Sequence, residues 1–256
     1  MTPARRIIIS CVSVGLVLAL WELSGTLGWI DPLILPSPSE ISATTWDILQ
    51  HGYRQTPLWQ HVLISLTRAL VAFIAASLLG IPIGIAMGMV PTLNAILDPF
   101  VQFLRPLPKL ALIPLVIVWF GIGEMSKLFL IFIAVFLTVV VGSVAAVGTV
   151  KQGRIRAAQT LGVTRFQLFR YVVLPHVVPE LLVTVRLALG IGWTTLIAAE
   201  MIASEAGLGW MVVNAGSYLR TDVVMLGIFL LGITGYALDF GIVKLQKKLA
   251  PWTGRD

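Results

Sequence analysis

The sequence has few of the residues from which soluble domains, disulfide frameworks and metal sites are built. Only 12% of its 256 residues are charged, about half the share in an average soluble domain, and 57% are hydrophobic. The single cysteine, Cys11, excludes an intrachain disulfide and a thiolate metal site. The histidines, His51, His61 and His176, form no H-E-x-x-H pattern, so we interpret them as structural and predict no metal site.

Sequence patterns for binding ATP and nucleic acid are also missing. There is no G-x-x-x-x-G-K-[ST] pattern and no lysine follows a glycine, so we expect this chain to bind no cofactor itself. The net charge of +6 is spread between apolar runs and does not gather on one face, which argues against nucleic acid as a partner. Basic residues between apolar runs indicate membrane topology instead.

Long apolar runs predict an all-α membrane protein with about six transmembrane helices, because a helix crosses the hydrocarbon core in about 20 residues. We expect one transmembrane domain, residues 1–256. Its expected spans are approximately 7–28, 62–90, 99–120, 125–150, 180–203 and 223–243. The first run follows Arg5 and Arg6, as in a signal peptide, but no small-x-small cleavage pattern ends it, so we expect it to stay as a helix.

The second expected span contains a glycine repeat and a proline. Gly80, Gly84 and Gly88 form a doubled G-x-x-x-G, which lets another helix backbone approach closely and therefore predicts helix packing. Pro82 predicts a break or a kink. Before this span, residues 39–50 are expected to form a short surface helix.

The third expected span is the least regular, because Pro106, Pro108 and Pro114 fall close together. Irregular backbone at membrane depth is tolerated only where protein or a water-filled cavity satisfies it. Two interpretations stay open. One is a broken helix that lines a cavity, and the other is an interfacial loop followed by a short helix over residues 110–120.

The distribution of Lys and Arg predicts that both termini face the cytoplasm, since these residues accumulate in cytoplasmic loops. The basic residues then on the cytoplasmic side are Arg5, Arg6, Lys151, Arg154, Arg156, Arg165, Arg170, Lys244, Lys247, Lys248 and Arg255. Only Arg54, Lys127 and Arg220 fall on the outer side. Arg68, Arg105, Lys109 and Arg186 lie within or beside spans.

The polar segment 151–175 carries the clearest functional pattern. Two alanines and a leucine occupy neighbouring helical positions among arginines, and a glycine follows, which predicts a short basic amphipathic helix. An apolar face outside the membrane needs a partner, either the anionic inner leaflet or a groove on a cytoplasmic protein. The small alanines favour the groove, because a lipid-inserting face normally carries larger side chains.

This segment resembles the cytoplasmic EAA loop of permease subunits of bacterial ABC importers. The match lies in Ala157-Ala158, Gly162 and Leu174-Pro175, although Arg156 stands where that motif has Glu and Val172 where it has Ile. The resemblance implies that the segment couples the permease to an ATPase. The implied coupling residues are Arg154, Arg156, Ala157, Ala158, Leu161, Gly162, Leu174 and Pro175.

Other segments extend the resemblance from about Pro32 to the C-terminus. Residues 105–114, 119–124, 199–202 and 207–209 are similar to permeases for nitrate, sulfonates and taurine. Residues 58–61, 190–194, 221–224 and 250–252 look most like the taurine permeases of that family. The resemblance implies a type I ABC importer permease fold in the bacterial inner membrane, with both termini inside.

The resemblance also implies the partners and the substrate. It implies a homodimer of this chain in membrane lipid, two cytoplasmic subunits that bind ATP and Mg, and a periplasmic substrate-binding protein. Taurine is the expected substrate, with another aliphatic sulfonate or nitrate as alternatives.

Polar residues at membrane depth are candidates for the path of an anionic substrate, because such groups usually face a wet route or each other. The candidates are Arg105, Lys109, Glu124, Arg186, Trp193, Thr194 and Glu200. Arg186 and Glu200 lie about 21 Å apart along one helix, so they cannot pair within it. The alternative roles are anchoring for Arg186, packing for Trp193, and structural hydrogen bonds or binding-protein contact for the two glutamates.

Two other classes of function are less consistent with the sequence. An intramembrane enzyme acting on lipid needs clustered carboxylates, histidines or a serine elbow, and the sequence shows no such cluster. A self-sufficient carrier predicts an internal hydropathy repeat and coupling acids in broken helices, whereas here only one region is broken. We therefore expect a transport subunit, not an enzyme, with ATP hydrolysed by its partners.

Overall fold

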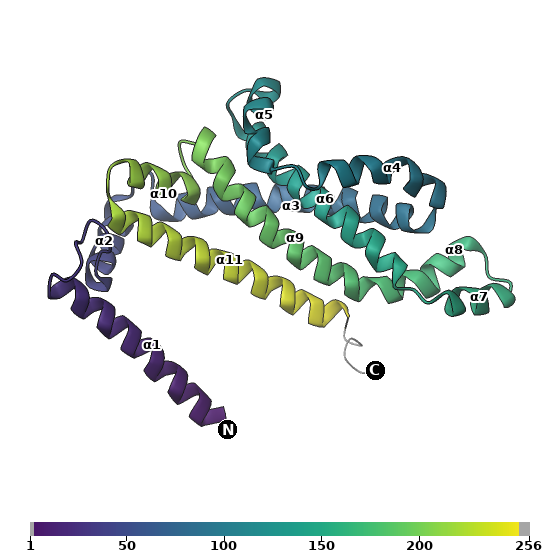
Figure 1. Cartoon of the computed structure of the whole chain (residues 1–256), viewed down its shortest axis with the longest axis horizontal. Coiled ribbons are helices and arrows are strands. Elements are labelled where there is room, and N and C mark those ends of the chain that lie inside the picture. The colour runs from purple at the N-terminus through teal and green to yellow at the C-terminus, as the bar shows by residue number, and fades with distance from the viewer. Residues whose placement is uncertain (1–2, 251–256) are drawn as a thin grey trace. The chain divides into compact units, whose positions relative to one another are not determined.

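The computed structural model describes residues 3–250, and these form helices and connecting loops without a β-strand (Figure 1). Arg255, Pro251 and Trp252, which entered the sequence predictions, lie outside the described residues. The chain divides into two compact units. Of the described residues, one unit contains 3–64 and 205–232, and the other contains 65–204 and 233–250.

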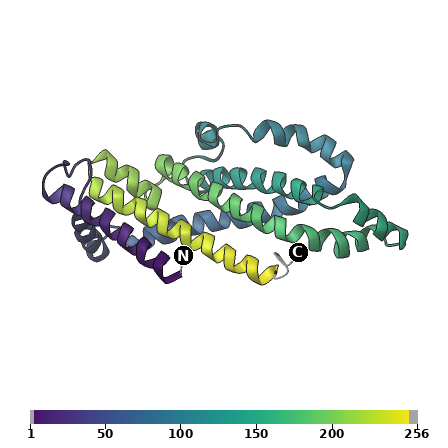
Figure 2. The ribbon, with the colours of Figure 1, turned by 60° about the horizontal axis from the view of Figure 1, so that its bottom comes forward.

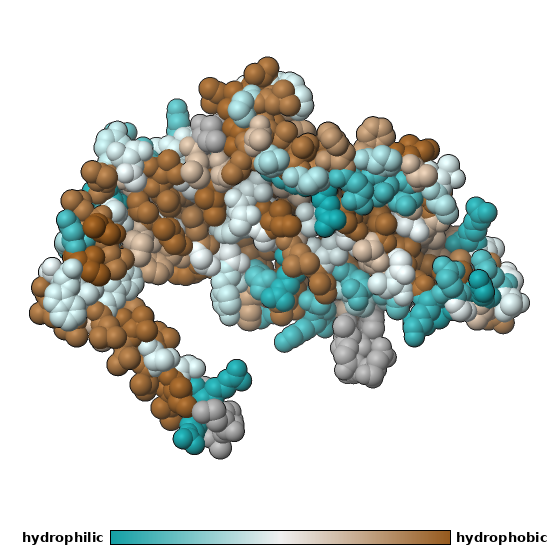
Figure 3. All heavy atoms as spheres, in the orientation of Figure 1, coloured by the Kyte–Doolittle hydropathy of each residue, from teal (hydrophilic) through white to brown (hydrophobic). Residues whose placement is uncertain are grey.

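The first unit contains α1 (Pro3–Thr26), α2 (Pro38–His51), the start of α3 (Leu58–Met89), α10 (Leu208–Ser217) and the start of α11 (Thr221–Leu249). Its buried cluster joins α2, α3, α10 and α11. The members of this cluster are Ile41, Ile48, Leu58, Met211, Ala215, Val223 and Leu226. In contrast, α1 buries none of its apolar stretch, which suits a helix surrounded by lipid (Figure 3).

The short helix expected over residues 39–50 is present as α2. It begins with a capping box, in which the Ser37 hydroxyl accepts from the Glu40 N–H and the Glu40 carboxylate accepts from the Ser37 N–H. Helix α10 was not predicted from the sequence. It follows Gly207, whose φ of +126° favours glycine.

The second unit is built around α6 (Glu124–Gly148) and α9 (Leu174–Ala203), which run side by side in Figures 1 and 2. The chain reaches α6 through α4 (Pro91–Leu104), the 3₁₀ helix η1 (Lys109–Leu112) and α5 (Ile113–Phe120). Between α6 and α9 lie α7 (Gln152–Thr160), α8 (Arg165–Leu168) and the π-helical turn η2 (Phe169–Val173).

The glycine repeat of α3 lies against α6. A Cβ at Gly84 would come 2.6 Å from the Ser143 Cβ, and one at Gly88 would come 2.7 Å from the Val147 Cβ. Both distances are shorter than atoms tolerate, so the two helices approach as closely as they do because these residues lack side chains. Gly80 makes the same kind of contact with Val139 at a longer distance.

Five helices are long and apolar enough to cross a membrane, and a sixth crossing is formed if α4 and the η1–α5 segment count as one broken span. These two parts meet at an angle of 91°, as in a broken span or a re-entrant loop, and the short helix expected over residues 110–120 is present as η1 and α5. The break falls at the loop containing Pro106 and Pro108. The number of spans predicted from the sequence agrees with these helices.

Several helices continue beyond the spans expected from the sequence. The helix of the span expected from residue 62 begins at Leu58, that of the span from 99 at Pro91, and that of the span from 180 at Leu174. The last helix extends from the expected residue 243 to Leu249. Of the break or kink predicted at Pro82, the break is absent, because α3 stays helical through this proline to Met89.

Candidate functional site

The segment between α6 and α9 forms two short helices with a defined turn. Helix α7 ends before Gly162, whose φ of +72° lies in the left-handed region that favours glycine. Thr164 then begins α8, because its hydroxyl accepts from the Gln167 N–H while the Gln167 side chain accepts from the Thr164 N–H. The glycine stop predicted from the sequence is therefore present.

The apolar side chains of this segment divide into an inner and an outer set. Ala158 is buried, and Ile155 packs against the buried cluster where the ends of α3, α6 and α9 meet. Leu161 is 83% exposed and Phe166 is 72% exposed, and Ala157 is exposed too. The prediction that both alanines share one apolar face was thus wrong, because only Ala157 points outward.

We call the outward set, Ala157, Leu161 and Phe166, the docking face. Arg156 and Arg165 are exposed on the same segment, and Figure 3 shows hydrophilic side chains gathered around α7 and α8. Large apolar side chains flanked by cations are typical of a surface that binds another protein. Leu174 and Pro175 follow at the start of α9, half-buried and exposed respectively.

Polar contacts hold α7 to the start of α9. The Arg154 guanidinium lies 3.2 Å from the His176 Nδ1, and the Thr149 hydroxyl lies 3.4 Å from the His176 Nε2. His176 therefore has structural contacts at this junction.

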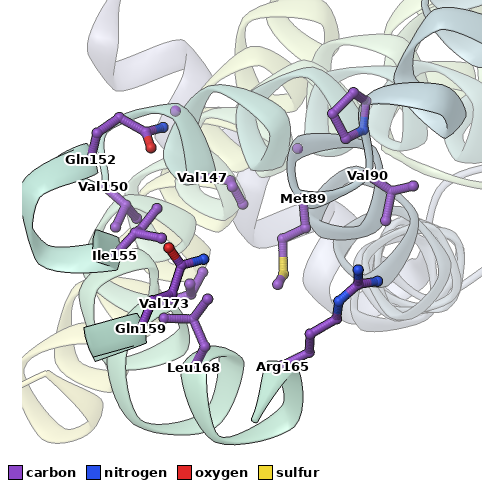
Figure 4. A pocket seen from close by; sticks show the side chains of 13 residues that line it. Met89, Val90, Val147, Val150, Gln152, Ile155, Gln159, Arg165, Leu168 and Val173 are labelled. Atoms are coloured by element: carbon purple, nitrogen blue, oxygen red, sulfur yellow. The ribbon is translucent and has the colours of Figure 1, made fainter. Parts of the chain in front are cut away.

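A cavity of about 550 Å³ lies between α7, α8 and the ends of α3 and α6 (Figure 4). Its wall is mainly apolar, and Gln152, Gln159 and Arg165 contribute polar groups. Met89 and Val90 line it from the end of α3 and the link to α4, whereas Leu168 lines it from α8. The short helices are thus not fully packed against the helix ends that they connect.

Two of the predicted pathway residues, Glu124 and Glu200, meet at Arg68. The Arg68 guanidinium binds Glu124 through two hydrogen bonds of 2.6 Å and binds Glu200 through one of 2.8 Å. Glu200 also accepts from the Ser65 hydroxyl at 2.8 Å, and Lys127 lies 2.8 Å from Glu124. We call this set of five residues the buried network, and it ties α3, α6 and α9 together.

The buried network is a structural element, because most of its charged side chains are inaccessible to solvent. Glu200 is fully buried and Arg68 and Lys127 are nearly so, whereas the Glu124 side chain is 56% exposed. Two carboxylates face two cations, so the charges balance within the network. All three guanidinium nitrogens of Arg68 are engaged, which satisfies the condition under which buried charges are tolerated.

Arg186 belongs to a different ion pair. Its guanidinium makes two hydrogen bonds with Asp239 of α11, from Nε to Oδ1 at 2.5 Å and from Nη2 to Oδ2 at 2.7 Å. The side chains are 46% and 38% exposed, so this pair lies at the surface of its unit. No pattern in the sequence had pointed to Asp239.

The other predicted pathway residues are not drawn into these two clusters. Lys109 donates to the carbonyl of Arg105 at the break between α4 and α5, and neither residue joins an ion pair within the described part of the chain. Trp193 is buried, and a Cβ at Gly235 would lie 3.0 Å from its Nε1, so it packs α9 against α11. Thr194 is exposed, with its hydroxyl bonded to the Ile191 carbonyl.

The sequence did not reveal Arg68 as the link between the glutamates. Its only signal was a lone arginine within an apolar span, which indicates an unnamed partner in another span. Residues 3–250, apart from those whose placement is not described, contain no group of three His, Cys, Asp or Glu residues that could hold a metal.

Comparisons with known proteins give the chain's relatives. It is 46% identical to the taurine transport system permease protein TauC of Escherichia coli (strain K12), over 98% of this chain and 92% of the relative. It is 37% identical to the putative aliphatic sulfonates transport permease protein SsuC of the same organism, over 93% and 89%. The nitrate import permease protein NrtB of Synechococcus elongatus is 28% identical over 95% and 87%.

A solved structure supports the fold. An inward-facing form of the MetNI methionine ABC transporter matches with a TM-score of 0.65 and 21% identity, over 75% of this chain and 95% of that chain. The fold is therefore that of type I ABC importer permeases. Residues 80–254 match the family described as binding-protein-dependent transport system inner membrane component. With the match to TauC, this shows that the chain belongs to that family of inner-membrane permeases.

Proposed function

We propose that the chain is the transmembrane subunit of an ATP-driven importer that carries a small sulfonate, most readily taurine, across the inner membrane. The observation that carries the ATP-driven role is the docking face, because a chain without its own ATP-binding pattern exposes large apolar side chains on a basic cytoplasmic-side segment. ATP and Mg would bind to the partner subunits, and two copies of this chain would form the pathway.

The docking face suits a groove on a cytoplasmic ATPase subunit. Leu161 and Phe166 provide side chains that can fill apolar pockets, and Arg156 and Arg165 provide charges for the rim of such a contact. Helix α7 follows α6 in the chain, and its Ile155 packs against the buried cluster where α6 and α9 meet. Movement of the docked segment would therefore be passed to both membrane helices.

The substrate proposal rests on relatives. The taurine permease shares 46% of aligned residues over nearly the whole chain, more than the sulfonate relative at 37% or the nitrate relative at 28%. A periplasmic binding protein would deliver the substrate. Another aliphatic sulfonate is the second candidate, supported by the same set of relatives.

Co-purification tests the docking face. The tagged chain would be purified from its native membrane as wild type, as Leu161→Asp and as Leu219→Asp. Leu219 is a matched control, since it is 70% exposed and lies in the loop before α11, which is not part of the segment. We expect the ATPase subunit to accompany the wild type and Leu219→Asp, and to fall about tenfold with Leu161→Asp, because a carboxylate would enter an apolar pocket.

The proposal fails if no ATPase subunit accompanies the wild type. If Leu161→Asp retains as much ATPase as the control, the ATPase docks elsewhere and the segment should be tested on vesicles of anionic lipid. Equal recovery of the tagged chain in all three preparations shows that the substitutions did not remove the permease itself.

A further inference from the structure

The ion pair between Arg186 and Asp239 lies in an unusual environment. Both residues fall within helices that can span the membrane, residues 165–201 and 221–248. Arg186 lies about 22 Å along its helix from Met201, which is at the predicted outer end. Asp239 lies about 14 Å along its helix from Lys248, which is at the predicted cytoplasmic end. The pair is thus within the apolar length of both helices, on the side predicted to be cytoplasmic.

A charged pair at this depth is not stable against lipid tails. Ionisable groups within membrane spans face a bundle interior, a partner or a water-filled cavity, because hydrocarbon cannot solvate them. Yet the Arg186 and Asp239 side chains are 46% and 38% exposed in their unit. The surface that carries them must therefore meet water or protein in the assembled transporter.

The surface of α9 around the pair continues as a polar and small stripe. Arg186, Gly190 and Thr194 follow one another at intervals of one helical turn, and all three are exposed. Thr194 lies about 12 Å from Arg186 along the helix axis, towards the predicted outer end. Two helical turns after Arg186, Trp193 packs against Gly235 and holds α11 beside this stripe. A path that reaches the ion pair from the outside would run along it.

The buried network does not offer the same opportunity. All guanidinium nitrogens of Arg68 are engaged with carboxylates or neighbouring groups, and Glu200 is fully buried. A ligand would have to displace a buried carboxylate from a cation, which leaves a charge unpaired. Arg186 and Asp239, in contrast, have their charged groups accessible from the surface of the unit.

We propose that Arg186 and Asp239 form a binding site for the two charged groups of a zwitterionic sulfonate on its way to the cytoplasm. The planar fork of Arg186 is suited to the oxygens of a sulfonate, and the Asp239 carboxylate is suited to an ammonium group. Taurine carries both groups, two carbons apart. Its entry replaces one ion pair by two, so no charge is left uncompensated. This inference rests on the proposed sulfonate transport.

Cysteine labelling tests whether this surface is wet. In a Cys11→Ala background, Thr194→Cys and Val14→Cys would be made in the full transporter and exposed to a water-soluble, membrane-impermeant thiol reagent from each side. Val14, midway along the exposed α1, is the control for a residue facing lipid. We expect Thr194→Cys to react, millimolar taurine to slow it, and Val14→Cys to remain unmodified.

Transport assays test the role of the pair. Arg186→Gln and Asp239→Asn would be compared with Asp222→Asn, which removes the charge from another Asp–Arg pair, in proteoliposomes containing the ATPase and the binding protein. We expect the first two to lose about tenfold in taurine uptake while ATP hydrolysis stays within about twofold of wild type, since tenfold corresponds to one lost ionic contact. Asp222→Asn should keep its ratio of uptake to ATP hydrolysis.

The outcomes separate this inference from the proposed function. If the wild type accumulates taurine but uptake and ATP hydrolysis fall together in both variants, the pair is only a structural tie and the inference is overturned. The same holds if uptake is unchanged, if Thr194→Cys does not react, or if taurine leaves its labelling unaffected. If the wild type accumulates no sulfonate, the proposed function fails, whereas the labelling still reports whether this surface meets water.

Discussion

The second unit contains two arginine–carboxylate clusters that differ in burial more than in chemistry. Arg68 lies among Glu124, Glu200 and Ser65, nearly inaccessible, and joins three helices. Arg186 pairs with Asp239 at the surface of the unit. The same guanidinium–carboxylate geometry thus serves as a fixed tie where water is excluded and as an accessible pair where it is not.

The difference in burial predicts a difference in stability. A buried charge that loses its partner is strongly destabilising, whereas an exposed ion pair contributes little. Substitutions in the two clusters should therefore separate into those that weaken the folded permease and those that spare it.

The largest expected effect is that of Arg68→Met. This change removes the cation from the fully buried Glu200 and should destabilise the protein by about 3–5 kcal/mol. Thermal inactivation of the purified complex, followed by size-exclusion chromatography, measures the effect against Arg186→Met as control. An equal loss of thermal stability in Arg68→Met and Arg186→Met would contradict this prediction, because it would show that both clusters stabilise the fold to the same extent.

Glu124→Gln should have an intermediate effect. Its side chain is 56% exposed, and Arg68 would retain Glu200, so we expect a loss of about 1 kcal/mol. The Arg68→Met and Glu124→Gln double variant sharpens the result, because its loss should be smaller than the sum of the two single losses. Strict additivity in the same thermal assay would show that the two side chains do not interact.

Asp239→Asn should change stability least. The exposed position of the pair predicts a midpoint shift of less than about 2 °C in the thermal assay. The variant's taurine uptake should nevertheless be reduced, as expected for a binding role. A large drop in the midpoint, with uptake reduced only in proportion to the folded fraction, would show that Asp239 has a structural role like that of the buried network and no binding role.

The membrane helices and the end of α7 could be predicted from the sequence because they depend on residues that are close together in the chain. The apolar runs predicted the spans, and Gly162 predicted the end of α7, since a left-handed residue after an amphipathic stretch needs no tertiary information. The helices that begin at Leu58 and Leu174 start before the expected spans, because hydropathy marks where the hydrocarbon begins and not where the helix does. Helix α10 was missed because its ten residues are too few for a span.

The contacts between helices could not be predicted in the same way. Arg68, Glu124 and Glu200 lie in three different helices, and no spacing within one helix indicates which of them meet. Asp239 was overlooked for the same reason, because its partner lies 53 positions away. The opposite orientations of Ala157 and Ala158 depend on how α7 packs on the buried cluster, which the amphipathic pattern alone did not resolve.

The most direct test of the account is taurine accumulation in proteoliposomes that contain this chain alone or together with its ATPase and the binding protein. The account predicts accumulation only with the ATPase, ATP and the binding protein all present, because the permease supplies the path and its partners supply the energy and the substrate. Accumulation by the chain alone, or none with the complete set, would contradict it.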